Sequence, residues 1–235
     1  GGGAMAAKSI TRRKAASPAW VVLKFGGTSV SSVERWETIA ALLRQRQAEG
    51  LRPVVVHSAL ATVSNKLDEL LHRALEMDVT AQVAGIRELH LRLAAGLQVD
   101  GEKELGGYFR ELEQLLAGIH LIREVSPRIQ ARVMGLGELM ATRLGAAYLA
   151  RVGLKVTWLD ARELLRSNMP PGTNERSAWL AANCDFDPDA ELQARFAAEA
   201  GVVLTQGFIA SNARGDGVLL GRGGSDTSGA YFAAK

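Results

Sequence analysis

The chain has 235 residues, of which 47% are hydrophobic and 23% charged, a composition typical of a globular protein that buries a sizeable core. No apolar run approaches the roughly 18 residues that a membrane span needs, and a single cysteine, Cys184, excludes an intrachain disulfide and suits a reducing cytoplasm. Four basic residues and no acidic one lie in the first nineteen positions, so the rest carries 24 basic against 25 acidic residues, which removes the compositional argument for nucleic acid.

Residues 1–19 differ from the rest of the chain. The letters GGGA before Met5 are typical of a cloning remnant, and the basic stretch that follows is typical of a flexible tail. A transit peptide would also be rich in arginine and poor in acids, whereas a secretory signal would need an apolar core of about 7–15 residues. We predict that the folded part begins at residue 20.

The first folded segment predicts a strand, a helix and a second strand. Residues 20–25 (WVVLKF) are apolar and partly β-branched, as in a buried strand. Ser31 and Glu34 have the spacing of a capping box, and apolar residues at helical spacing follow until Gly50. A strand at 53–57 then completes a βαβ unit, which implies parallel strands.

The remaining chain continues the alternation of helices and strands. Several helices are expected between about 65 and 122, and the clearest of them, at 103–119, has one apolar stripe. The further expected elements are a helix from Ser126-Pro127 to Gly153, a strand at 154–159, a loop or irregular hairpin at 166–186, a helix from Asp187-Pro188 to about 200, strands at 202–209 and 218–220 around a turn at 212–217, and a final helix. This order predicts an α/β fold with a mostly parallel sheet.

The first junction between strand and helix, KFGGTS at 24–29, has the residues of a phosphate site. Gly26 and Gly27 allow close approach of the backbone, and successive N–H groups in such a turn form an anion-binding concavity. Lys24 adds a full positive charge, while Thr28 and Ser29 add hydroxyl donors. The alternative is a tight turn with a solvated lysine. A Gly-Gly pair on its own favours this alternative.

Two other glycine-rich segments carry charged residues. The junction at 221–226, GRGGSD, follows a short apolar strand, and its Arg222 offers a planar fork for a carboxylate or phosphate. Asp226 is placed to cap the last helix. Glu138 follows a glycine pair on an otherwise apolar helix face, where a lone glutamate is usually solvated.

Together these segments resemble the aspartokinases of the amino acid kinase superfamily. The similar segments are KFGGTSV at 24–30, SALATVSNKL at 58–67, GLGELM at 135–140, LDAR at 159–162, TQGFIASN at 205–212 and LGRGGSD at 220–226. The resemblance covers nearly all of residues 20–235. It implies a three-layer αβα fold with an open, mostly parallel sheet of the carbamate kinase-like type, cut before its C-terminal part.

The resemblance also implies roles for individual residues. Lys24 would contact the transferring phosphoryl group of ATP, which the turn residues Gly26, Gly27, Thr28 and Ser29 would cradle. Asp226 would orient Lys24. The substrate-binding residues implied are Ser64, Glu138, Arg222, Gly223 and Ser225.

The implied reaction transfers the γ-phosphoryl group of ATP, bound with Mg²⁺, to the side-chain carboxylate of L-aspartate. That carboxylate is already ionised at neutral pH, so no general base is needed, and the sequence offers no obvious Ser-His-Asp or His-metal set. Glu138 would pair with the substrate ammonium and Arg222 with a substrate carboxylate. Ser64 stands where the family usually has threonine, and His57 stands where valine is usual, so we interpret His57 as a satisfied strand histidine.

Family members continue past this segment with much of the nucleotide site and often with regulatory ACT domains. We therefore expect residues 20–235 to be the substrate-binding part of the kinase domain, inactive alone and belonging to a homo-oligomer at full length. The CDFDPD segment and the VLL before GRGGSD resemble forms fused to diaminopimelate decarboxylase. The alternatives are a kinase for glutamate, a carbamate or a nucleoside monophosphate such as UMP, and a non-catalytic amino acid sensor of the same fold.

Overall fold

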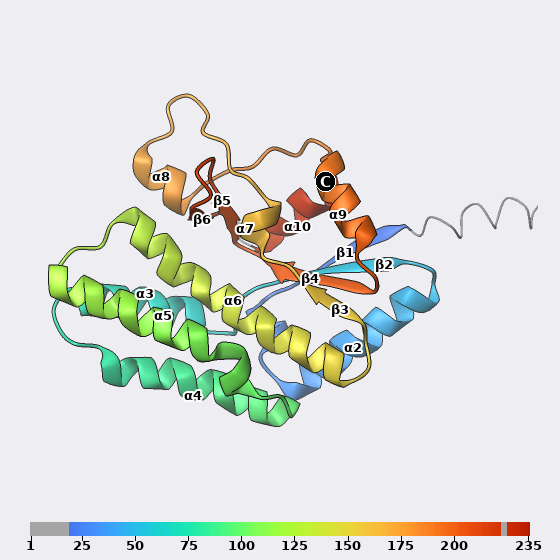
Figure 1. Cartoon of the computed structure of the whole chain (residues 1–235), viewed down its shortest axis with the longest axis horizontal. Helices are drawn as coiled ribbons and strands as arrows, with labels where there is room; N and C mark the ends of the chain where they lie inside the picture. The colour runs from blue at the N-terminus through green and yellow to red at the C-terminus, as the bar shows by residue number, and fades with distance from the viewer. Residues whose placement is uncertain (1–18, 222–224) are drawn as a thin grey trace, which may run out of the picture.

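The computed structural model describes residues 19–221 and 225–235, with the side chains of Ser225 and Asp226 left out, so the predicted tail lies almost wholly outside the described residues. Figure 1 shows the arrangement of the elements. In chain order they are β1 (Trp20–Phe25), the 3₁₀ helix η1 (Gly27–Val30), α2 (Val33–Ala48), β2 (Arg52–His57), α3 (Val63–Ala74), α4 (Thr80–Leu97), α5 (Gly101–Ile122), α6 (Pro127–Arg151), β3 (Val156–Trp158), α7 (Ala161–Leu164), α8 (Glu175–Leu180), α9 (Ala190–Ala198), β4 (Val202–Gln206), β5 (Ile209–Ser211), β6 (Gly217–Leu219) and α10 (Ser225–Ala234).

The main sheet has four strands in the order β1-β2-β4-β3, and every neighbouring pair is parallel. Helices α2 and α6 cover one face, where Gly145 of α6 lies against Trp36 of α2. Helices α9 and α10 cover the other face, where Phe196 packs against Trp20 and Phe232 (Figure 1). The predicted three-layer αβα arrangement with parallel strands is confirmed.

Three local predictions need correction. The strand expected at 202–209 ends at Gln206, because Phe208 has a φ of +73° and turns the chain into the antiparallel pair β5–β6. The segment 166–186 contains the helix α8, capped by Asn174, rather than being wholly irregular. The helix expected from Asp187 begins after Asp189, whose side chain accepts a hydrogen bond from the backbone N–H of Leu192.

The start of α2 also differs from the predicted capping box. The capping residue is Ser32, whose hydroxyl oxygen accepts a hydrogen bond from the backbone N–H of Arg35 at 3.2 Å. Ser31, the predicted cap, instead donates its hydroxyl hydrogen to the carbonyl oxygen of Gly27 and accepts from the N–H of Ala61. The short helix η1 displaces the cap by one residue, which leaves Ser31 for a contact between loops.

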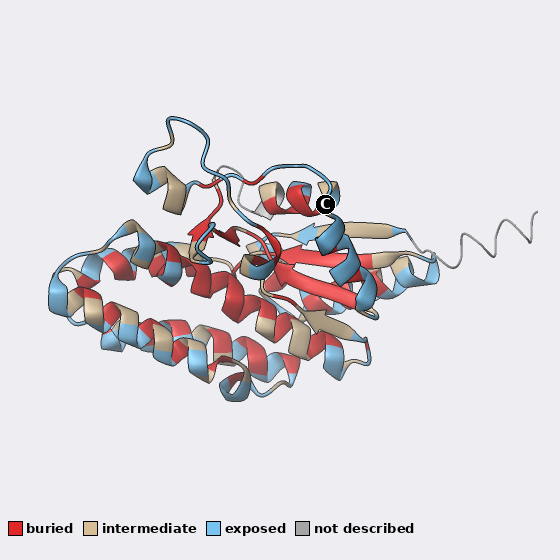
Figure 2. Ribbon diagram, turned by 45° about the horizontal axis from the view of Figure 1, so that its top comes forward, coloured by how far each residue is buried: buried red, intermediate tan, exposed pale blue. Residues whose placement is uncertain are grey.

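The core lies between the sheet and α6, where Figure 2 shows buried residues on both β4 and the middle of α6. His57 is part of this core, and burial lowers its pKa to about 4. Its Nδ1 lies 2.9 Å from the carbonyl oxygen of Ser58, but its Nε2 has no hydrogen-bond partner among the described residues. The interpretation of His57 as a satisfied strand histidine therefore holds for Nδ1 and is wrong for Nε2.

Replacing Gly145 by alanine is expected to destabilise the fold by about 1–3 kcal/mol through overpacking. An added Cβ would lie 2.3 Å from Cη2 of the buried Trp36 and 3.0 Å from Nε2 of His57. The matched control is Gly118→Ala on α5, where an added Cβ meets no described atom within 4 Å and helix propensity predicts a gain of up to about 1 kcal/mol. Urea denaturation measures both, and equal stability changes in the two variants would contradict the packing account.

Candidate active site

The loops after the parallel strands meet at one edge of the sheet. Phe25, His57 and Gln206 pair in register as the last residues of β1, β2 and β4. The next backbone groups continue this row. The N–H of Ser58 donates to the carbonyl oxygen of Phe25 at 3.1 Å, and the N–H of Gly207 donates to the backbone carbonyl oxygen of His57 at 2.9 Å. This carboxyl edge is where open α/β sheets bind ligands.

The turn after β1 forms one wall of this edge. Lys24 is exposed at the end of the strand, and its aliphatic stem packs against Gly229 of α10. Gly26 is exposed, and the chain then coils into η1, closed by a hydrogen bond from Ser29 N–H to the Gly26 carbonyl oxygen at 3.1 Å. A Cβ on Gly27 would lie 2.9 Å from the carbonyl oxygen of Ala59, so only glycine lets the turn approach the loop after β2 this closely.

Glu138 of α6 lies against the loop after β2 and is only 3% exposed. Its Oε2 accepts a hydrogen bond from the backbone N–H of Ala59 at 3.0 Å, while its Oε1 has no hydrogen-bond partner within the described part of the chain. The preceding glycine explains how α6 comes so near, because a Cβ on Gly137 would lie 3.1 Å from Cβ of Ala59. The residue is therefore not the solvated glutamate that an isolated helix position favours.

Burial raises the pKa of Glu138 to about 8, against the opposing effect of the hydrogen bond from Ala59. In this environment the carboxyl group is mostly protonated at neutral pH. A cation placed against Oε1 would reverse this balance, because an opposite charge favours the carboxylate. The arrangement is suited to bind an ammonium group and release a proton as it does so.

The structure describes the remaining predicted site residues to different extents. Ser64 lies half-buried in the first turn of α3, directly after Val63, which packs near Gly137. Arg222 and Gly223 lie outside the described residues. The backbones of Ser225 and Asp226 begin α10, the helix that packs on β1 beside Lys24, but their side chains are likewise outside the description.

A buried polar network beside the site was not foreseen from the sequence. The side chain of Gln206 accepts from the N–H of Ala161 at 2.7 Å and donates to Oγ1 of Thr142 at 3.0 Å. Thr142 in turn accepts from Nε1 of Trp158 at 2.9 Å and donates to the backbone carbonyl oxygen of Glu138. The network joins the ends of β3 and β4 to the helix turn that carries Glu138. The sequence signal for it is a polar residue four positions after Glu138 on an apolar face.

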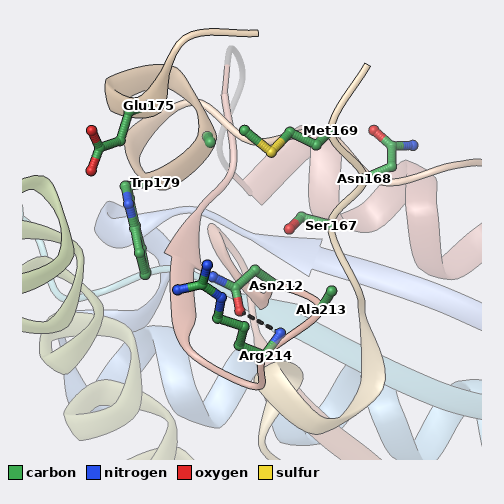
Figure 3. A pocket seen from close by; sticks show the side chains of 9 residues that line it. Ser167, Asn168, Met169, Glu175, Trp179, Asn212, Ala213 and Arg214 are labelled. Carbon is green, nitrogen blue, oxygen red and sulfur yellow. Dashed lines mark hydrogen bonds between the residues drawn. The ribbon is translucent and has the colours of Figure 1, made fainter. Parts of the chain in front are cut away.

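A cavity of about 510 Å³ lies elsewhere, between α8 and the β5–β6 hairpin. Figure 3 shows Trp179 and Glu175 on one side of it and Arg214 and Asn212 beneath. The Asn212 side chain is already occupied, because its oxygen accepts from the N–H of Arg214 at 2.9 Å. Of the predicted site residues that the structure describes, none lines this cavity.

The described residues contain neither a membrane-spanning helix nor a cluster of metal-ligating side chains. Within residues 19–221 and 225–235, no helix is both long and apolar enough to cross a membrane. In the same residues, no group of three or more His, Cys, Asp or Glu side chains is placed to hold a metal ion.

The stability of the unliganded chain is expected to be highest near pH 6.5. His57 and His90 have pKa values lowered to about 4 by burial, so the unfolded chain holds their protons more tightly and stability rises with pH up to about 6.5. Glu138 has the opposite effect between its ordinary value of 4.5 and about 8, because the folded chain retains its proton. Above pH 6.5 the two histidines no longer contribute, and the proton that folded Glu138 retains makes stability fall by about 1.4 kcal/mol per pH unit toward pH 8.

Urea denaturation at several pH values between 6.5 and 8 checks this expectation. Glu138→Gln removes the titrating group, so its stability is expected to be flat over the same range. A wild-type stability that is constant or rising from pH 6.5 to 8 would contradict the buried protonated state of Glu138.

Comparison with known proteins places this geometry in a family. The model of the amino acid kinase family matches residues 19–235. The chain is 35% identical over 217 residues to aspartokinase 2, chloroplastic, of Arabidopsis thaliana, covering 87% of this chain and 38% of that protein. It is 30% identical over 218 residues to the lysine-sensitive aspartokinase 3 of Escherichia coli, covering 91% of this chain and 46% of that protein.

The fold is similar to that of E. coli aspartokinase III in complex with aspartate and ADP, with a TM-score of 0.75 and 28% identity over 92% of this chain and 46% of the other. The chain thus spans less than half the length of these relatives. The family match over residues 19–235, together with a parallel sheet whose glycine turn and buried glutamate share one edge, shows that the chain belongs to the amino acid kinase family.

Proposed function

We propose that this chain supplies the acceptor-binding side of an aspartate kinase. The observation that carries the proposal is the buried carboxyl group of Glu138. One of its oxygens is bound by Ala59, in the loop that packs against Gly27, and the other has no described partner. A site that binds an ammonium group next to a phosphate-binding turn is suited to an amino acid as phosphoryl acceptor. The aspartokinases among the relatives support aspartate as that amino acid.

In the proposed reaction, a side-chain carboxylate oxygen of aspartate attacks the γ-phosphorus of ATP. The new O–P bond forms as the bond to the β,γ-bridging oxygen breaks, giving 4-phospho-L-aspartate and ADP. Lys24 and the backbone N–H groups of the Gly26–Gly27 turn stabilise the negative charge on the transferring group. Mg²⁺ would enter with the phosphates of ATP, as it commonly does in kinases.

The other residues receive roles under the same proposal. Thr28 and Ser29 add hydroxyl donors beside the turn. Ser64, Arg222, Gly223 and Ser225 bind aspartate, with the Arg222 guanidinium on a carboxylate, and Asp226 orients Lys24. The placement of α10 beside Lys24 supports the last assignment, since a Cβ on Gly229 would lie 3.4 Å from Cδ of the lysine.

The product would enter the synthesis of amino acids derived from aspartate, such as lysine, threonine and methionine, by the diaminopimelate route in the case of lysine. The single buried cysteine fits a reducing compartment such as the cytoplasm. The natural-length protein is proposed to be a homo-oligomer.

The test is an ATP-dependent assay of the natural-length protein in which hydroxylamine traps the acyl phosphate. Formation of the hydroxamate with L-aspartate, at least about 100-fold faster in kcat/KM than with L-glutamate, is the expected result, because an extra methylene displaces the carboxylate from in-line geometry. Faster turnover of glutamate, a carbamate or UMP would assign another kinase of the family. Calorimetric binding of aspartate without any consumption of ATP would favour a sensor.

A further inference from the structure

We propose that Ser31 is a positioning residue that holds the phosphate-binding turn and the acceptor-binding loop in register. The phosphate-binding turn is residues 26–30, and the acceptor-binding loop is residues 58–62. This inference deepens the proposed function and rests on it for its effect on turnover. The contact itself is a property of the fold and can be tested without any reaction.

The hydroxyl group of Ser31 bonds to both segments at once. It donates to the carbonyl oxygen of Gly27 in the turn, and it accepts from the backbone N–H of Ala61 in the loop at 2.8 Å. Two residues before Ala61, the N–H of Ala59 donates to the carboxylate oxygen of Glu138. A continuous chain of hydrogen bonds and peptide units therefore runs from the turn that would hold the phosphoryl group to the residue that would hold the ammonium group.

The phosphate-binding turn approaches the acceptor-binding loop closely at Gly27. An added Cβ on Gly27 would lie 2.9 Å from the carbonyl oxygen of Ala59 and 3.2 Å from the backbone nitrogen of Ala61. The loop ends at Thr62, which has a φ of +72° and precedes α3. A non-glycine residue keeps such a conformation only where its surroundings hold it there, and the residue before it, Ala61, is bonded to the Ser31 hydroxyl.

The consequence for phosphoryl transfer concerns alignment rather than affinity. The acceptor carboxylate needs no general base, so the rate depends on holding it in line with the bond that breaks. Each substrate keeps its own contacts in the Ser31→Ala variant. The phosphate-binding turn and the acceptor-binding loop, however, lose the hydroxyl group to which both are hydrogen-bonded. Ser31→Ala is therefore expected to lower kcat while leaving both KM values nearly unchanged.

The adjacent serine provides a matched control. Ser32 caps α2 by accepting from the N–H of Arg35, and among the described residues its side chain has no hydrogen bond to the acceptor-binding loop. Ser32→Ala removes a hydroxyl group one position away and lowers stability through loss of a cap, which distinguishes a general loss of stability from a loss of alignment. Both variants and the wild type are compared in the natural-length protein by the hydroxylamine assay.

The expected result is a fall in kcat of at least about tenfold for Ser31→Ala, with KM values within threefold and with Ser32→Ala close to wild type. Equal kcat values for Ser31→Ala and wild type, or equal losses in the two variants, would overturn the proposal. Amide hydrogen exchange of the 235-residue chain gives a second readout. Exchange at Ala61 is expected to accelerate at least tenfold in Ser31→Ala and not in Ser32→Ala, and equal protection in all three proteins would also overturn it. If the wild type does not phosphorylate aspartate, the proposed function fails while the exchange measurement still decides the role of Ser31.

Discussion

Replacing Lys24 by methionine is expected to lower the kcat of phosphoryl transfer by about 10²–10³-fold in the natural-length protein. Methionine retains an unbranched apolar stem, so the packing of the side chain against Gly229 on α10 is preserved. What is removed is the positive charge at the end of β1, beside the turn in which charge develops on the transferring group. Because that charge grows in the transition state, the KM for aspartate is expected to change by less than about threefold.

The control for this prediction is Lys155→Met. Lys155 is also exposed, but it precedes β3 and therefore lies at the amino edge of the parallel sheet, away from the turn. Steady-state kinetics with the hydroxylamine assay measure both variants. A Lys24→Met enzyme with kcat within threefold of wild type would contradict the assignment of Lys24 to the phosphoryl group.

Glu138→Gln is expected to weaken aspartate binding by at least about 100-fold, because it leaves a buried ammonium group without its counter-charge. The amide oxygen of glutamine can still accept from Ala59, so the loop contact is retained. The effect should have a distinct proton signature. Because burial raises the pKa of Glu138 to about 8, wild-type binding at pH 7 should release about one proton per aspartate, and affinity should rise with pH up to about 8.

Calorimetry of the 235-residue chain in two buffers with different ionisation enthalpies measures this proton release. The matched control is Glu113→Gln, which changes an exposed glutamate on α5 and should leave affinity and proton release unaltered. Tight aspartate binding by Glu138→Gln, or wild-type binding without proton release, would show that the ammonium group does not meet this carboxyl.

The layered α/β fold could be predicted because its strands and helices carry local signals. The run WVVLKF, the stop at Gly50 and the Ser126-Pro127 start each act within a few residues, and each appears in the structure. The break after Gln206 could not be predicted in the same way. It depends on Phe208 adopting a left-handed conformation. The backbone N–H of Phe208 donates to Oγ of Ser228, which lies twenty residues later in the sequence.

In the candidate site, too, some residues could be predicted from local sequence signals, whereas others depend on how distant segments pack. Lys24 and its glycines could be predicted as site residues because a strand, a charge and a turn stand together in the sequence. The burial of Glu138 depends instead on how α6 packs on the loop after β2, which the Gly137 contact with Ala59 makes possible. The contacts of Ser31 could not be predicted, because either Ser31 or Ser32 can cap a helix. Only the position of η1 decides that Ser32 is the capping residue.

The central claim is that the turn after β1 and the carboxyl group of Glu138 face the same aspartate. A crystal structure of the natural-length protein with L-aspartate and a non-hydrolysable ATP analogue tests this most directly. The account predicts the substrate ammonium within hydrogen-bond distance of Oε1 of Glu138, and the side-chain carboxylate directed at a γ-phosphate held by Lys24 and the Gly26–Gly27 turn. Aspartate bound with its ammonium away from Glu138, or nucleotide phosphates bound away from that turn, would contradict it.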